Sequence, residues 1–73
     1  MSSTVVQQTL IEHNNLWRQR NTALLAKAEQ QSVQGHCWEA TVLLAQYDES
    51  EVRRLQIWAS TLRAYPELQE QPT

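Results

Sequence analysis

The chain has one glycine, one cysteine and no phenylalanine, and its first proline is Pro66. Glycine and proline most often interrupt regular structure, so about thirty residues on each side of Gly35 run without an interruption. A lone cysteine, Cys37, excludes an internal disulfide and is typical of a reducing compartment. No C-x-x-C or H-x-x-x-H spacing is present, so we expect no metal site and no cofactor.

The chain also has little net charge and no long hydrophobic run. The formal net charge is -2, and neither half of the chain carries the basic stripe that binding to a phosphate backbone needs. The segment Met1 to Val6 has no basic region or long apolar run, and no stretch approaches the roughly 20 apolar residues of a membrane span. These absences predict a cytoplasmic protein that binds neither nucleic acid nor membrane.

The 73 residues are enough for one small domain. We predict an all-α fold over residues 1–73, an antiparallel helical hairpin of two long helices. The first helix runs from about Thr4 to Val33, Gly35 supplies the turn with a positive φ, and the second helix ends at Tyr65, because a residue before proline avoids helical angles. The polar tail 66–73 is predicted to be frayed.

Helical spacing places one apolar stripe on the first helix. Leu10, Trp17 and Leu24 are seven residues apart, the spacing of a coiled-coil-like seam. Asn14 and Asn21 occupy positions in this stripe where apolar residues are expected. Two interpretations remain open: buried asparagines that fix the register of the hairpin, or asparagines at the solvent edge of the stripe. The complete stripe consists of Val6, Leu10, Trp17, Leu24 and Ala28.

The second helix carries a comparable stripe, which the polar run Asp48-Glu49-Ser50-Glu51 interrupts. Asp48 could cap a new helix and Glu51 could complete a capping box, which would give a three-helix domain with a break near Asp48. We favour one continuous helix, because the apolar phase is kept across the run. The stripe contains Val42, Ala45, Val52, Leu55, Ala59 and Leu62; Trp38 begins it, and Leu44, Trp58 and Tyr65 widen it.

A lone hairpin buries one stripe on each helix and leaves its flanks uncovered. The apolar residues expected on these flanks are Val5, Ile11, Leu25, Leu43 and Ile57. We therefore expect another chain to cover part of the hairpin.

Two features could suggest catalysis. His36 and Cys37 are adjacent, but neighbours on a helix point in different directions, so we interpret them as a turn histidine and a partly buried small residue. The acidic run is interpreted as a solvated face with local salt bridges. With no glycine-rich phosphate loop and no metal site, the sequence predicts a non-enzyme.

Two resemblances to known families meet in this chain. The string Gly35-His36-Cys37-Trp38-Glu39-Ala40 resembles the turn of a tetratricopeptide repeat. Over residues 10–62, Arg18-Gln19-Arg20, Ala23, Leu25-Ala26, Gly35 and Cys37 resemble the small helical-hairpin co-chaperones of type III secretion needle subunits. That resemblance implies a protein that pairs with a tetratricopeptide-type chaperone in the bacterial cytoplasm and keeps a needle subunit monomeric before export.

We therefore predict a helical adaptor or co-chaperone that packs an apolar helical face on another protein. One alternative is a dimer of the chain with itself, a self-assembling helical bundle. Another is a small phage- or plasmid-encoded regulator or inhibitor of a larger complex. The predicted partner-binding residues are Leu10, Trp17, Leu24, Trp38, Val42, Trp58 and Leu62.

Overall fold

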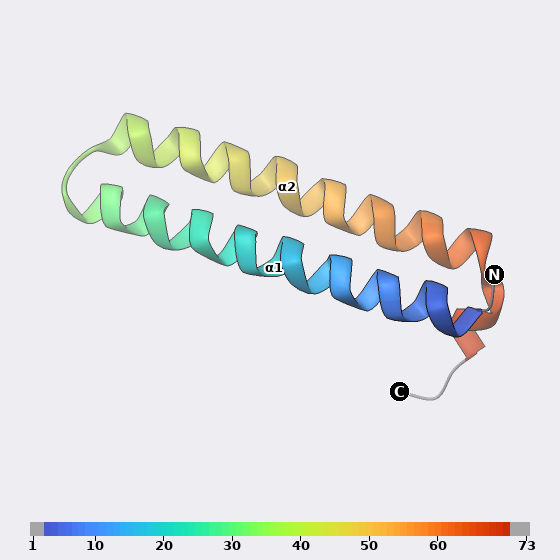
Figure 1. Cartoon of the computed structure of the whole chain (residues 1–73). Helices are drawn as coiled ribbons and strands as arrows, with labels where there is room; N and C mark the ends of the chain where they lie inside the picture. The colour runs from blue at the N-terminus through green and yellow to red at the C-terminus, as the bar shows by residue number, and fades with distance from the viewer. Residues whose placement is uncertain (1–2, 71–73) are drawn as a thin grey trace.

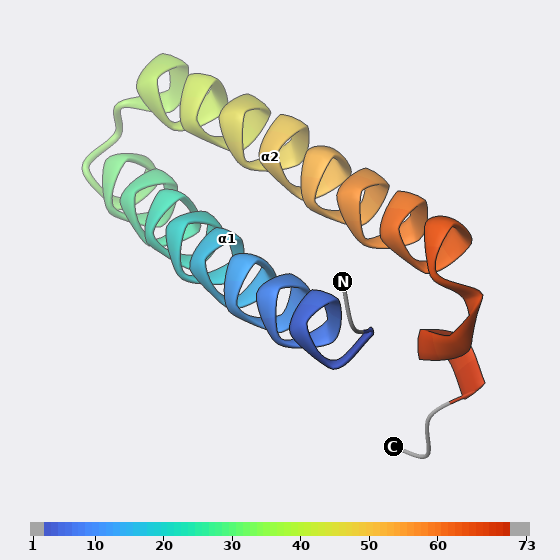
Figure 2. The ribbon, with the colours of Figure 1, turned by 45° about the vertical axis from the view of Figure 1, so that its right-hand side comes forward.

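The computed structural model describes residues 3–70. It contains helix α1, Ser3–Val33, helix α2, Cys37–Ala64, and a short 3-10 helix η1, Pro66–Glu70. The two long helices lie side by side and antiparallel along their whole length (Figures 1 and 2). The predicted all-α hairpin is confirmed. The alternative with a break near Asp48 is wrong, because α2 continues through this position.

The turn follows from the single glycine. Gly35 has a φ of 82°, a region that residues with a Cβ rarely adopt. The amide of Gly35 donates to the carbonyl of Ser32 at 3.0 Å and the amide of His36 donates to the carbonyl of Gln31 at 2.9 Å. This pair of bonds is the Schellman motif, which satisfies the last carbonyls of α1 and lets the chain reverse within three residues.

The opposite end of the hairpin is closed by η1. The helix α2 stops at Ala64, one residue before the predicted end at Tyr65, and Tyr65 caps it. Residues 66–70, the first part of the tail that the sequence predicts to be frayed, form η1, which contacts both long helices. Leu68 is buried there, so η1 places an apolar side chain against the open end of the hairpin. Residues 71–73 of the expected tail lie outside the described residues.

The molecule is a rod of 49 × 20 × 16 Å. Only four apolar side chains in the described part are buried: Leu10, Ala28, Ala40 and Leu68. A two-helix rod has one thin layer of side chains between its helices, so most of the apolar surface on each helix is not covered by the other.

Candidate interaction surface

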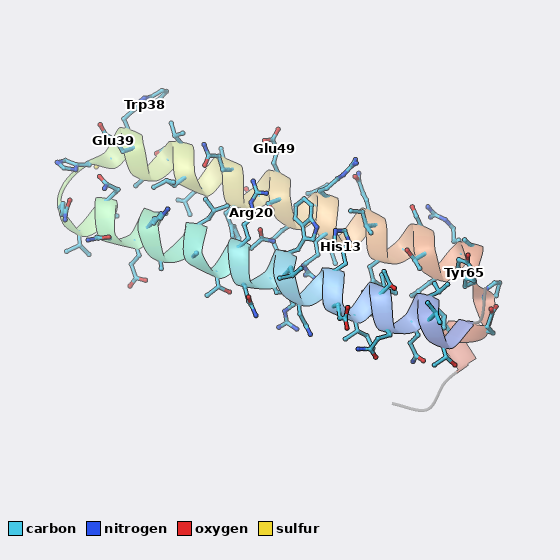
Figure 3. The ribbon with its side chains drawn as sticks, viewed as in Figure 1. His13, Arg20, Trp38, Glu39, Glu49 and Tyr65 are labelled. Carbon is cyan, nitrogen blue, oxygen red and sulfur yellow. The ribbon has the colours of Figure 1, made fainter. Side chains whose placement is uncertain are left out.

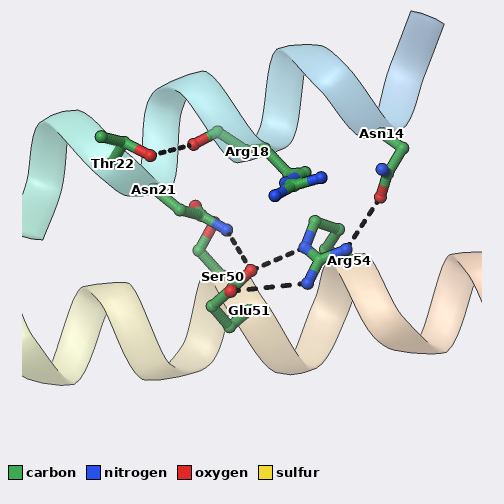
Figure 4. A network of polar contacts seen from close by, with 7 residues as sticks. All are labelled: Asn14, Arg18, Asn21, Thr22, Ser50, Glu51 and Arg54. Atoms are coloured by element: carbon green, nitrogen blue, oxygen red, sulfur yellow. Dashed lines mark hydrogen bonds and ion pairs between the residues drawn. The ribbon is translucent and has the colours of Figure 1, made fainter. Parts of the chain in front are cut away.

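A polar network joins the two helices at the middle of the hairpin (Figure 4). The Asn21 side-chain amide donates to the Glu51 carboxylate at 2.7 Å, and the Asn21 carbonyl oxygen accepts a hydrogen bond from Ser50. Arg54 donates to Glu51 at 2.7 Å and to the Asn14 side-chain oxygen at 2.9 Å. We call these five residues, Asn14, Asn21, Ser50, Glu51 and Arg54, the seam network.

The seam network satisfies the groups that it buries. Asn21 is 2 % exposed and Ser50 is buried, and among the described residues every buried side-chain nitrogen or oxygen has a hydrogen-bond partner. Burying a polar group without a partner would cost about 1–3 kcal/mol. The interpretation that asparagine is buried in the seam is therefore confirmed for Asn21, while Asn14 is half-buried.

The electrostatics of the network favour its charged form. The pKa of Glu51 lies below its ordinary value, chiefly because Arg54 donates hydrogen bonds to the carboxylate. Partial burial opposes this shift, whereas the Asn21 amide and the positive charges of Arg54 and Arg18 add to it. The same hydrogen bond from Arg54 to Glu51 raises the pKa of the guanidinium. The pair thus stays ionised and neutralises itself inside the seam.

The polar partners of the asparagines decide which side of α2 faces α1. Because Ser50, Glu51 and Arg54 point into the seam, all of the apolar stripe predicted for α2 except Leu62 lies on the other side, which corrects the sequence-based assignment. Leu43 and Ile57, expected on exposed flanks, are half-buried instead. The side chains of α2 that are buried or half-buried are Ala40, Leu43, Tyr47, Ser50, Glu51, Arg54, Ile57, Trp58, Thr61 and Leu62.

The predicted stripe of α1 does face α2. Leu10 and Ala28 are buried, and Val6, Trp17 and Leu24 are half-buried. The flank residues expected on α1 are exposed as predicted, and these are Val5, Ile11 and Leu25.

The seven predicted partner-binding residues are divided between two places. Leu10, Trp17, Leu24, Trp58 and Leu62 are buried or half-buried on the sides of the two helices that face each other. Trp38 and Val42 lie on the opposite side of α2, where Trp38 is 74 % exposed and projects away from α1 (Figure 3). A role in partner binding stays a prediction for all seven.

The displaced stripe leaves a row of exposed apolar side chains on α2, which we call the outer face. Its members follow helical spacing from the turn to the last turns of the helix, and every one of them is exposed. Val52 and Leu55, for example, are each 54 % exposed. The outer face consists of Trp38, Val42, Ala45, Val52, Leu55 and Ala59.

Aromatic and basic side chains of α1 border the outer face on one flank. The Trp17 indole donates to His13 at 2.7 Å and meets its ring edge-on. The guanidinium of Arg20 lies 5.5 Å from the centre of the Trp17 ring, within range of a cation–π contact. An open groove follows this flank, and its lining includes Trp17, Arg20, Ala45, Glu49, Val52 and Arg53.

The residues at the turn make no constellation of catalytic type. The His36 ring pairs with the Gln31 side chain at 2.7 Å, and Cys37 is exposed. In residues 3–70 no three His, Cys, Asp or Glu side chains lie close enough to hold a metal ion. Over the same residues, neither long helix has an apolar stretch sufficient to cross a membrane.

Sequence reasoning missed Ser50, Glu51 and Arg54 as partners of the asparagines, because the polar run was interpreted as a solvated face. A usable signal was present. In a hairpin that turns at Gly35, residues whose numbers add to about 70 lie opposite each other, and this sum pairs Asn21 with Ser50.

No family model, curated protein or solved structure matches this chain.

Proposed function

We propose that this chain is a non-catalytic interaction module that packs the outer face of α2 on a protein partner. The observation that carries the proposal is the row of apolar side chains, Trp38 to Ala59, that the hairpin leaves exposed. A patch of this kind on a small protein commonly marks an interaction site. Trp38 at one end is the type of side chain that anchors interfaces.

The face is rigidly presented, which also supports binding. The seam network holds α2 in one orientation by hydrogen bonds to α1. α2 therefore does not rotate to bury its outer face against α1, and the helix needs little further ordering when a partner binds. A partner helix laid along this face would meet a row of anchors at helical spacing.

The test uses three versions of the tagged full chain as bait in an extract of the source cells: wild type, Val52→Asp on the outer face and Leu16→Asp on α1. Leu16 is 64 % exposed, so it is a matched control for adding a charge to an exposed leucine-sized site. We expect wild type and Leu16→Asp to retain the same protein, including any second copy of this chain, and Val52→Asp to lose it. Equal retention by all three baits would overturn the proposal, provided that circular dichroism shows equal helicity.

The resemblance to needle-subunit co-chaperones extends this proposal to a specific partner, a tetratricopeptide-type chaperone in the bacterial cytoplasm. Identification of the retained protein by mass spectrometry tests that extension separately. A chaperone of that class would support it, and a partner of another class would remove it while leaving the interaction module in place.

A further inference from the structure

The charges beside the outer face are sorted by position along α2. Glu51 and Arg54 are engaged in the seam network. The remaining charged side chains of α2 are all exposed, and none of them takes part in the one ion pair found in the described residues. Acidic residues occupy the first half and basic residues the second: Glu39, Asp48 and Glu49, then Arg53 and Arg63.

The charges on such a helix are complementary to those on a second copy of the helix that runs antiparallel to it. Two copies of α2 that pack in parallel would place acid on acid and base on base, which is unfavourable. An antiparallel pair, related by a two-fold axis across the helices, places the acidic half of each copy on the basic half of the other.

The register of this pair is set by the match between Glu49 and Arg53. If the axis passes beside residue 51, Glu49 lies opposite Arg53 of the second copy. This match occurs twice because of the symmetry. Near the axis the two copies of Val52 meet, and farther out Val42 lies over Ala59 of the other copy.

The side chains also suit a close approach. The small residues Ala45 and Ala59 let helix axes come near each other, and at each end Trp38 lies beside Arg63 of the second copy, where the indole face and the guanidinium attract.

The exposed area of the whole chain is large for its mass. The chain exposes 5609 Å², whereas a compact protein of 8.5 kDa exposes about 4,700 Å². The excess of about 900 Å², which is spread over both helices, is of the same order as the roughly 800 Å² that each partner buries in a standard interface.

We infer that the partner of the outer face is a second copy of this chain, bound antiparallel through α2 with Glu49 paired to Arg53 of the other copy. The inference rests on the proposed function, because it names the partner of the same face. The test is sedimentation equilibrium on the full chain over a range of concentrations, with Glu49→Arg, Arg53→Glu and the double swap. Glu29→Arg, an exposed charge on α1, serves as the control.

We expect wild type and Glu29→Arg to form a dimer of twice 8.5 kDa. Each single reversal replaces two attractive contacts per dimer by two repulsive ones and should weaken dimerisation about tenfold, and the double swap should restore it. A chain that stays monomeric, or a dimer that the reversals leave unchanged, would overturn the inference.

The two proposals fail separately. If the chain is monomeric while Val52→Asp still loses a different protein from the extract, the self-association falls and the interaction module stands. If Val52→Asp neither weakens the dimer nor loses a captured protein, both proposals fall.

Discussion

Replacing Asn21 by alanine tests whether the seam network couples the two helices. The substitution removes the bond to the Glu51 carboxylate and the bond from Ser50, and it leaves the buried Ser50 hydroxyl without its acceptor. A bond to a charged group contributes about 1.5–3 kcal/mol and a neutral one about 0.5–1.5 kcal/mol. We therefore expect a loss of about 2–4 kcal/mol, a large share of the about 4–11 kcal/mol typical of a domain this small.

The assay is urea unfolding followed by circular dichroism, at one fixed protein concentration because self-association would change the apparent stability. Asn14→Ala is the matched control, since Asn14 is half-buried and makes one bond in the network. Its expected cost is about 1.5 kcal/mol, the lower end of the range for a bond to a charged group, because Asn14 is only half-buried. The double variant Asn21→Ala/Ser50→Ala removes the orphaned hydroxyl and should cost less than the sum of the single variants by about 1 kcal/mol. Equal costs for the two asparagines, or strict additivity in the cycle, would refute the reasoning.

Three further predictions concern acid, the turn and the closed end. Because the pKa of Glu51 is lowered in the folded protein, its contribution to stability is complete above the ordinary value near 4.5 and is lost as pH falls through the lowered value. Glu51→Gln should therefore make the free energy of unfolding less dependent on pH below 4.5. An unchanged pH slope would contradict this. An added Cβ at Gly35 meets nothing within 4 Å, so Gly35→Ala should cost about 1–2 kcal/mol from its positive φ alone, and Gly35→Asn, which tolerates that φ, should cost clearly less in thermal melts; equal melting temperatures would count against the assigned turn. Leu68→Ala should destabilise the hairpin by about 1–3 kcal/mol in urea unfolding, whereas Leu16→Ala should change stability by less than about 0.5 kcal/mol; similar values for both would mean that η1 does not close the end.

The architecture could be predicted from the sequence because the positions of glycine and proline are unambiguous. One glycine, with no proline before Pro66, leaves room for two long helices and one turn, and Gly35 has the positive φ that its position implied. The stripe of α1 was also predictable, since Leu10, Trp17 and Leu24 keep a strict seven-residue spacing and face α2.

The face of α2 could not be assigned from apolar spacing alone. Val42, Ala45, Val52 and Ala59 form a regular stripe, but in the structure Asn21 pairs with Ser50 and Glu51, which lie on the other side of α2. Burial of Trp58 and Ile57, which are larger, compensates for exposing those small side chains. The deciding information is the pairing between helices, which a pattern on one helix does not contain.

The central claim is that the seam network directs Ser50 toward α1 and the outer face away from it. Isotope-edited NOE spectroscopy on the full chain, with a filter that separates contacts within one chain from contacts between copies, measures this directly. We predict contacts within the chain from the Asn21 side-chain amide protons to Ser50 and Glu51. Contacts within the chain from Asn21 or Leu24 to the methyl groups of Ala45 and Val52 would place the apolar stripe inside the hairpin and contradict the account.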